Sequence, residues 1–164
     1  MSIFVPQRYI PNYLTKKDKK FAKNELIKSR KAYKKGKYYV RKKVSSFKSK
    51  KSKHIKKAEK LYNISDFKLN KLLASKTKCK LKTLKKIFSK GQGAYFSSGS
   101  RQNQTPFSWA YARLASAISG GKASAVDFKL LKNGCKSSSK ALKLAKKAYI
   151  KYNKGTRKVP KIKL

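Results

Sequence analysis

Acidic residues are nearly absent from this sequence. Asp and Glu together contribute five of the 164 residues: Asp18, Glu25, Glu59, Asp66 and Asp127. Paired-acid catalysis and hard-metal sites both need clustered carboxylate oxygens, yet Asp66 and Asp127 lie 61 positions apart with no acid between them. The composition therefore predicts a protein that is not an enzyme, with no catalytic residues, no metal ligands and no cofactor.

Cysteine and histidine are also scarce. Cys79, Cys135 and His54 are the only residues of these two types, and a structural zinc site normally needs four nitrogen or sulfur ligands. Two cysteines also cannot make a disulfide framework. We expect two reduced, partly buried thiols, and a single Cys79–Cys135 bridge is the alternative.

Long apolar runs are missing as well. No stretch approaches the roughly 18 consecutive apolar residues that a membrane span requires, so the sequence predicts no integral membrane segment. Residues 1–8 are too short and too soon charged to form a signal peptide. We expect synthesis in the cytoplasm or nucleus of the cell that makes the protein.

Positive charge, by contrast, is abundant. The chain has 41 Lys and 6 Arg against five acids, a formal net charge of +42. Self-repulsion at this density strains a compact state in water, so the composition predicts a polyanionic partner. Lysine lacks the bidentate fork with which arginine reads base edges. The lysine excess therefore favours sequence-independent binding, either to nucleic acid, with DNA favoured, or to an acidic protein face.

The charge is unevenly distributed along the chain. Residues 15–60 carry a net charge of +18, whereas residues 91–131 carry only +3. This contrast predicts a polybasic N-terminal region over 1–63, a small helical domain over 64–153 and a basic tail over 154–164. The first and last of these segments are called the basic arms below.

Candidate polyanion-binding residues come from the basic arms and from two glycine-containing turns. They are Lys16, Lys17, Lys19, Lys20, Lys42, Lys43, Lys48, Lys50, Lys51, Lys53, Lys56, Lys57, Arg101 and Lys122. Arg101 lies in the glycine- and serine-rich segment 91–105, which is predicted as a long loop. Glycines let a backbone approach a phosphate closely, but a surface loop without a ligand is the favoured interpretation.

The first 63 residues still contain helix signals. Thr15 and Asp18 fit a capping box, and Gly36 stands where a left-handed residue would end the helix. Residues 37–41 favour a short extended segment. A second helix is predicted over 52–62, with an apolar stripe at Ile55, Ala58, Leu61 and Tyr62.

Two further helices are predicted over 66–75, capped by Ser65, and over 80–89, ended by Gly91. Together they have the outline of a helix-turn-helix. Any antiparallel helix pair gives the same pattern, so a packing hairpin is favoured over a reader of the major groove.

The most apolar helix is predicted to begin at Thr105 and Pro106 and to end at Gly120. Arg113 on this helix is either a snorkelling side chain or a partner of Asp127. Helices over 122–132 and 137–153 complete an all-α fold of short helices. The predicted core residues are Phe107, Trp109, Tyr111, Leu114, Ile118, Phe128 and Leu131.

Two blocks of sequence carry a resemblance. Residues 90–105 read KGQGAYFSSGSRQNQT, 108–122 read SWAYARLASAISGGK and 125–128 read AVDF. A second block reads VPQRYIP over 5–11 and SRKAYKKGKYY over 29–39. These blocks resemble small lysine-rich proteins of large nucleocytoplasmic DNA viruses of algae and protists, of the chlorella-virus or mimivirus kind. The resemblance implies a viral, virion-associated protein and carries over no active-site residue.

Three functions remain open at this point. The favoured one is a structural virion protein, a minor capsid or core component whose arms neutralise the genome or an acidic capsid face and whose ordered part contacts other virion proteins. The second is a nucleic-acid-condensing, histone-like or RNA-binding protein. The third, a helix-turn-helix regulator, rests only on residues 66–89.

Overall fold

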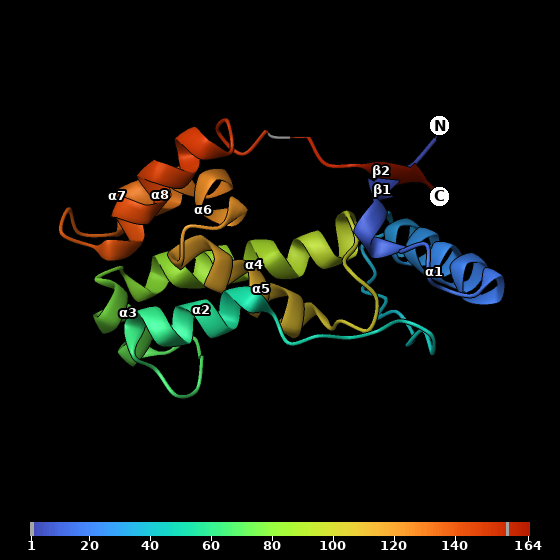
Figure 1. The fold of residues 1–164 in the computed structure, drawn as a ribbon, viewed down its shortest axis with the longest axis horizontal. Coiled ribbons are helices and arrows are strands. Elements are labelled where there is room, and N and C mark those ends of the chain that lie inside the picture. The colour runs from blue at the N-terminus through green and yellow to red at the C-terminus, as the bar shows by residue number, and fades with distance from the viewer. Residues whose placement is uncertain (1, 157) are drawn as a thin grey trace. The chain divides into compact units, whose positions relative to one another are not determined.

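The computed structural model describes residues 2–156 and 158–164 and is all-α apart from one small sheet (Figure 1). Its helices are α1 (Lys16–Lys34), α2 (Lys53–Tyr62), α3 (Lys71–Thr77), α4 (Leu81–Ser97), α5 (Pro106–Ile118), α6 (Lys122–Val126), α7 (Phe128–Gly134) and α8 (Lys140–Lys151). A 3-10 helix covers Gln7–Tyr9, and strands β1 (Phe4–Pro6) and β2 (Lys161–Lys163) lie near the two ends of the chain.

The chain divides into two compact units. Unit 1 contains Met1–Lys50, Gln92–Trp109 and Lys158–Leu164, and unit 2 contains Lys51–Gly91 and Ala110–Arg157. These limits differ from the boundaries expected at 63/64 and 153/154. The charge pattern records which side chains are solvated, whereas the units follow burial, and the lysine-rich N-terminal region contributes a core of its own.

The predicted start and end of the first helix are confirmed. The Thr15 hydroxyl accepts a hydrogen bond from the Asp18 amide at 3.1 Å. After Lys34 the chain makes a Schellman turn, in which Gly36 has φ +70° and the Lys37 amide donates to the Ala32 carbonyl. The return half of the capping box does not form, because the Asp18 carboxylate bonds to Ser46 instead.

The core of unit 1 is small. One cluster of buried apolar residues forms it: Val5, Tyr9, Ile10, Leu14, Ala22, Leu26 and Val44. Strand β2 pairs antiparallel with β1, with Val5 opposite Ile162 (Figure 1). The C-terminal segment is therefore no free tail. Residues 37–44 lie outside any helix or strand, so the one sheet of the described chain forms at the termini.

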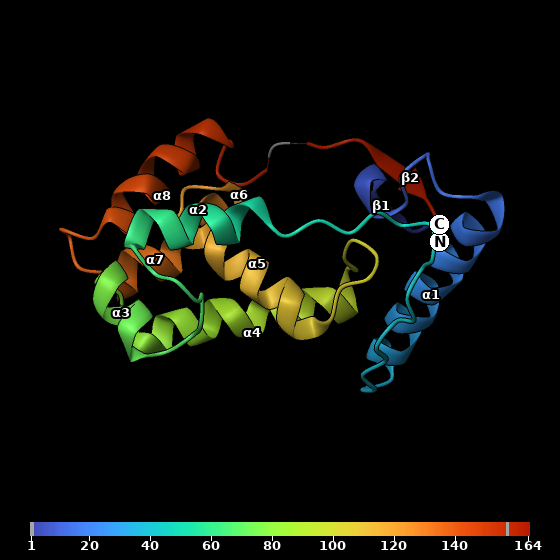
Figure 2. The ribbon, with the colours of Figure 1, turned by 60° about the horizontal axis from the view of Figure 1, so that its bottom comes forward.

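Unit 2 has the larger core, built on the predicted stripe of α2. Ala58 and Tyr62 are buried, and Ile55 and Leu61 pack against the same cluster. The Tyr62 hydroxyl donates to the Ile118 carbonyl at 2.5 Å, and burial strongly raises the pKa of this phenol. Figure 2 shows α8 alongside α6 and α7, with which it shares most of its helix contacts.

The helix pair after α2 departs from the sequence prediction. Helix α3 begins at Lys71, where the Asn70 side chain accepts from the Leu73 amide, and Ser65 caps nothing. Helix α4 does not end at Gly91 but continues to Ser97. A Cβ on Gly91 would lie 2.7 Å from the Cα of Ala110. The glycine is thus needed for close approach between α4 and α5, and the expected long loop shrinks to residues 98–105.

Helix α5 begins as predicted. The Thr105 hydroxyl accepts from the Ser108 amide at 3.0 Å, and the Ser108 hydroxyl accepts from the Thr105 amide at 2.8 Å. One predicted core assignment is wrong, and one predicted core residue belongs to the core of unit 1 instead of unit 2. Phe107 is 61% exposed, and Trp109 packs on the core of unit 1, edge-on to Tyr9.

The other predicted core residues lie in unit 2. Leu114, Ile118 and Leu131 are fully buried, and Tyr111 and Phe128 are partly buried against them. The prediction of a central core helix therefore holds for the C-terminal two thirds of α5. Its first turn faces solvent or belongs to unit 1.

Cys79 and Cys135 form a disulfide, which corrects the expectation of two free thiols. The two residues face each other in an isolated antiparallel bridge, flanked by hydrogen bonds from the Lys80 amide to Gly134 and from the Lys136 amide to Lys78. Side chains approach closely at such a position between flanking hydrogen bonds. The sequence could not show this, because the bridge is created by tertiary contact across 56 positions.

Candidate polyanion-binding surface

The candidate lysines at the start of α1 lie beside a second group of candidates. Lys16, Lys17 and Lys20 are exposed on the first turns of α1, and Lys19 is half-buried there. The Asp18 carboxylate accepts from the Ser46 amide at 2.9 Å and from its hydroxyl at 2.5 Å, which ties residues 42–50 to this end of the helix. These hydrogen bonds lower the pKa of Asp18. The N-terminal region is therefore a folded basic surface and not a free arm.

A buried arginine fixes the same segment from the other side. Arg41 is 8% exposed and donates to the Tyr95 carbonyl at 2.8 Å and to the Ser100 hydroxyl at 2.5 Å. Its guanidinium also lies 3.8 Å above the Tyr95 ring. Burial lowers the pKa of Arg41, yet an arginine stays charged at any physiological pH. This residue organises unit 1 and is not available to a partner.

Most candidates in the segment after Arg41 remain exposed. The exposed set is Lys42, Lys43, Lys48 and Lys50. The Lys42 amide donates to Glu25 and the Val44 amide to the Asn103 side chain, at 2.8 and 2.7 Å. Backbone contacts of this kind hold the segment while its lysine side chains point to solvent.

Arg101 lies near another cation. Burial and then the positive charge of Arg8 lower the pKa of the Arg101 guanidinium. Arg8 itself lies 5.7 Å from the centre of the Tyr9 ring. The structure thus brings two arginines into one neighbourhood of unit 1, where an anion would relieve their repulsion.

The remaining candidates belong to unit 2. Lys51, Lys53, Lys56 and Lys57 are exposed at the start and along the outer face of α2, and Lys51 pairs with Glu59 at 3.4 Å. Lys122 is the first residue of α6 and is half-buried. The structure therefore distributes the candidates over both units and does not gather them into one patch.

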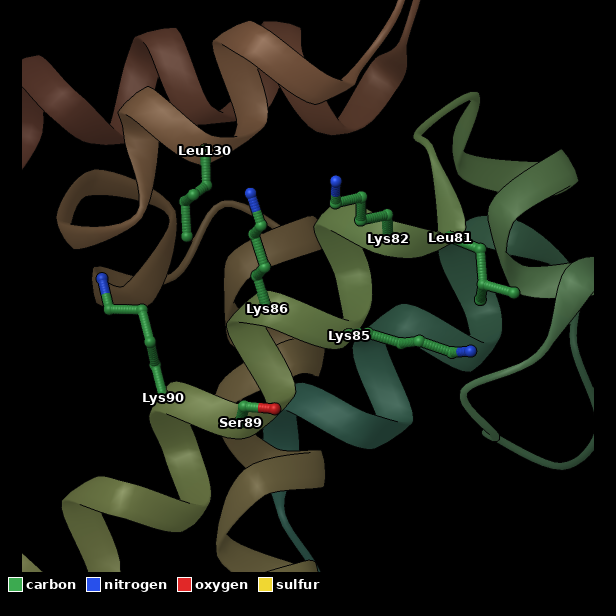
Figure 3. Close-up of a pocket in the computed structure, with 7 residues that line it drawn as sticks. All are labelled: Leu81, Lys82, Lys85, Lys86, Ser89, Lys90 and Leu130. Carbon is green, nitrogen blue, oxygen red and sulfur yellow. The ribbon is translucent and has the colours of Figure 1, made fainter.

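Sequence reasoning missed a basic groove on unit 2. A shallow, open groove of about 630 Å³ on unit 2 is lined by Leu81, Lys82, Lys85, Lys86, Ser89, Lys90 and Leu130. Figure 3 shows Lys82, Lys86 and Lys90 extending from α4 on the side of Leu130, while Lys85 points elsewhere. These three lysines are called the α4 lysine row. Their i, i+4, i+8 spacing in the sequence could have indicated that they share one helix face. The expectation that the helix ends near residue 89 left Lys90 outside that face.

One end of the α4 lysine row is anchored by a buried carboxylate. Asp127 is fully buried, and its Oδ1 accepts from Lys90 Nζ and from Arg113 Nη2, both at 2.8 Å. Arg113 Nε also donates to Oδ2 at 3.0 Å. This confirms Arg113 as the partner of Asp127. Two cations share one carboxylate here, so the site keeps a net positive charge.

Carboxylates neutralise few of the other lysines. Within the described residues, ion pairs within 4 Å involve only Lys51, Lys68, Lys90 and Arg113. Lys82 and Lys86 of the α4 lysine row have no carboxylate oxygen within that distance. The groove therefore contains two lysines without a carboxylate partner, Lys82 and Lys86, beside the paired Lys90, and Leu81 and Leu130 are its apolar lining residues.

The chain belongs to the Family of unknown function (DUF5824), whose model matches residues 6–133. The matched segment includes α1 to α6 and the α4 lysine row. No curated protein and no solved structure matches the chain. Among the described residues, no helix has both the length and the apolar character that crossing a membrane demands.

Proposed function

We propose that this chain is a non-enzymatic structural protein of the virion of a large DNA virus, a minor capsid or core component that binds nucleic acid without sequence specificity. The observation that carries the binding part is the α4 lysine row, in which Lys82 and Lys86 lack a carboxylate partner. The proposal of a virion component rests on the resemblance of residues 90–128, which overlap this row at Lys90.

The spacing of the α4 lysine row suits a phosphate backbone. Eight residues of helix span about 12 Å, and one strand of duplex DNA presents a phosphate about every 3.4 Å along the axis. Three lysine heads on flexible stems can therefore follow several successive phosphates. Each contact releases a counterion, which is the main source of sequence-independent affinity.

The type of residue supports this choice over a regulator that reads base edges. The exposed positions among the first nine residues of α4 are Lys82, Lys85, Lys86 and Ser89. None is Arg, Asn or Gln, whose planar side-chain groups present two polar atoms to one base edge, whereas lysine presents a single point charge. Such a helix end suits contact with phosphates.

Both units share the charge. Unit 1 has 21 basic and 2 acidic residues, a net of +19, and unit 2 has 26 and 3, a net of +23. A chain with two units of similar net positive charge can contact two segments of a genome, or a genome and an acidic protein. This fits a component of a packed particle.

The test is the salt dependence of binding to duplex DNA. A contact with about 8–15 phosphates gives a slope of log K against log salt of about −7 to −13. Lys82→Gln with Lys86→Gln should make the slope less negative by about two, for any DNA sequence. The matched control is Lys143→Gln with Lys147→Gln, two exposed lysines at the same spacing on α8.

A slope near zero for the unaltered protein would contradict nucleic-acid binding and would leave an acidic capsid face as the partner. Equal effects of the two double substitutions would remove the special role of the α4 lysine row. Detection of the chain in purified particles, in the shell or the core, tests the assignment to the virion.

A further inference from the structure

Three aromatic rings of unit 1 gather around a partly open surface. Tyr33 and Tyr38 are 38% and 73% exposed, and Phe96, whose ring lies beside both, is buried. The ring centres of Tyr38 and Phe96 are 5.1 Å apart, and those of Tyr33 and Phe96 are 6.4 Å apart with nearly parallel planes. These three residues are called the aromatic platform.

The fold holds this platform in place. Tyr33 lies in the last turn of α1, and the Schellman turn at Gly36 returns the chain so that Tyr38 comes back beside it, at 6.3 Å between ring centres. Phe96 in α4 packs edge-on against Tyr95, the fully buried ring on which Arg41 rests. The floor of the platform is therefore attached to the most constrained part of unit 1.

The surroundings of the platform are positive. Lys34, Lys35 and Lys37, its neighbours in sequence, are exposed. Arg30 lies one turn before Tyr33 on α1 and donates to the Ser98 carbonyl at 3.3 Å, while its Nε is buried without a partner. The nearest acid in sequence, Glu25, is buried and accepts from the Tyr39 hydroxyl. Open ring faces and unpaired cations thus occur together.

We propose that the aromatic platform stacks unpaired bases of single-stranded nucleic acid while the flanking lysines contact its backbone, an inference that rests on the proposed nucleic-acid binding. Proteins that bind single strands without sequence preference combine a basic track with exposed aromatic faces. A duplex keeps its bases stacked on each other and cannot use the rings. An acidic protein would contact the lysines but would not stack on the aromatic rings.

The experiment compares single-stranded oligothymidylate with a duplex of equal phosphate number, at one salt concentration. Tyr38→Leu keeps apolar bulk but removes the ring, and because Tyr38 is 73% exposed the change removes little buried surface. We expect Tyr38→Leu to weaken binding of the single strand about tenfold, as loss of one stacked base does, and to change duplex binding less than twofold. Tyr38→Phe should retain single-strand affinity.

Phe4→Leu is the matched control, since Phe4 is an aromatic residue of the same unit that is 55% exposed and lies outside the platform. An unchanged single-strand affinity in Tyr38→Leu would overturn the platform, while salt-dependent duplex binding would still support the proposed function. Loss of polyglutamate binding in the same variant would make an acidic protein the occupant and also overturn it. If the unaltered protein binds neither strand form, both proposals fall.

Discussion

Units 1 and 2 are stabilised in different ways. Unit 2 buries a cluster of sixteen apolar residues and closes it with the Cys79–Cys135 disulfide. The core cluster of unit 1 has seven buried apolar residues, and the unit also contains buried polar side chains that bond across long stretches of sequence. Arg41 reaches Ser100, and Gln102 donates to the Tyr9 carbonyl at 2.9 Å.

The difference teaches how a chain of net charge +42 can contain folded units. Where apolar side chains are dense enough, helices pack on each other and lysines occupy the outer faces. Where they are sparse, buried hydrogen bonds fix irregular backbone, since each buried polar group that lacks a partner costs about 1–3 kcal/mol. Unit 1 should therefore be sensitive to loss of a hydrogen-bonding group and unit 2 to loss of apolar volume or of its cross-link.

The largest expected effect is on the core of unit 2. Leu114 is fully buried, so Leu114→Ala should lower the free energy of unfolding by about 2–5 kcal/mol, from lost transfer energy and the cavity left behind. Urea denaturation followed by circular dichroism measures this. Leu72→Ala, at a 52% exposed position of the same unit, should cost far less, and equal costs would mean that the core is misplaced.

The second largest effect is expected from removing the disulfide. Cys79 and Cys135 are 56 positions apart, and a cross-link over a loop of that length contributes about 4 kcal/mol in the chain-entropy description. Replacing both cysteines with serine should lower the urea midpoint of unit 2. A midpoint that does not move on adding a reductant to the unaltered protein would show that the bridge contributes nothing.

Arg41 tests the polar organisation of unit 1. Arg41→Met keeps the stem but leaves the Tyr95 carbonyl and the Ser100 hydroxyl without their donor, at a cost of about 1–3 kcal/mol. Trp109, the only tryptophan of the chain, packs on the core of unit 1, so its fluorescence reports the change. Lys42→Met changes the neighbouring, exposed side chain and should leave the unfolding transition followed by Trp109 fluorescence unchanged.

The smallest expected effect is a loss of the thermal stability of unit 1 at acidic pH. The hydrogen bonds from Ser46 lower the pKa of Asp18, so the folded state favours the ionised carboxylate. The stabilisation is present above the ordinary Asp pKa of about 4 and is lost as the pH falls through the lowered value. Asp18→Asn should weaken the acid-dependent loss of thermal stability in unit 1. An identical pH profile in the variant would contradict this role.

Local signals in the sequence located many elements. The caps at Thr15 and Thr105, the stop at Gly36 and the stripe of α2 follow from side chains within a few residues of each other, and all four are confirmed. The prediction was wrong at Gly91, because the sequence alone does not distinguish a glycine that ends a helix from a glycine that lets a neighbouring helix pack closely. Only the 2.7 Å approach of Ala110 distinguishes them.

The sequence predicted the basic character of the candidate surface but not its location. Composition alone indicated a basic surface, while the α4 lysine row depended on knowing that α4 runs unbroken from Leu81 to Ser97. The aromatic platform needed more. Tyr33 and Tyr38 are near in sequence, but Phe96 joins them only because α1 and the end of α4 pack within one unit.

The sequence by itself determined the charge, the all-α class and most helix ends, because these depend on composition and on contacts within one or two turns. The tertiary structure decided which of these residues meet. It paired Cys79 with Cys135, moved Trp109 into the core of unit 1 and drew residues 37–50 onto α1 through Arg41 and Asp18. Such contacts join residues tens of positions apart in the sequence. A local sequence pattern cannot predict them, because only the folded chain brings these residues within a few ångströms of each other.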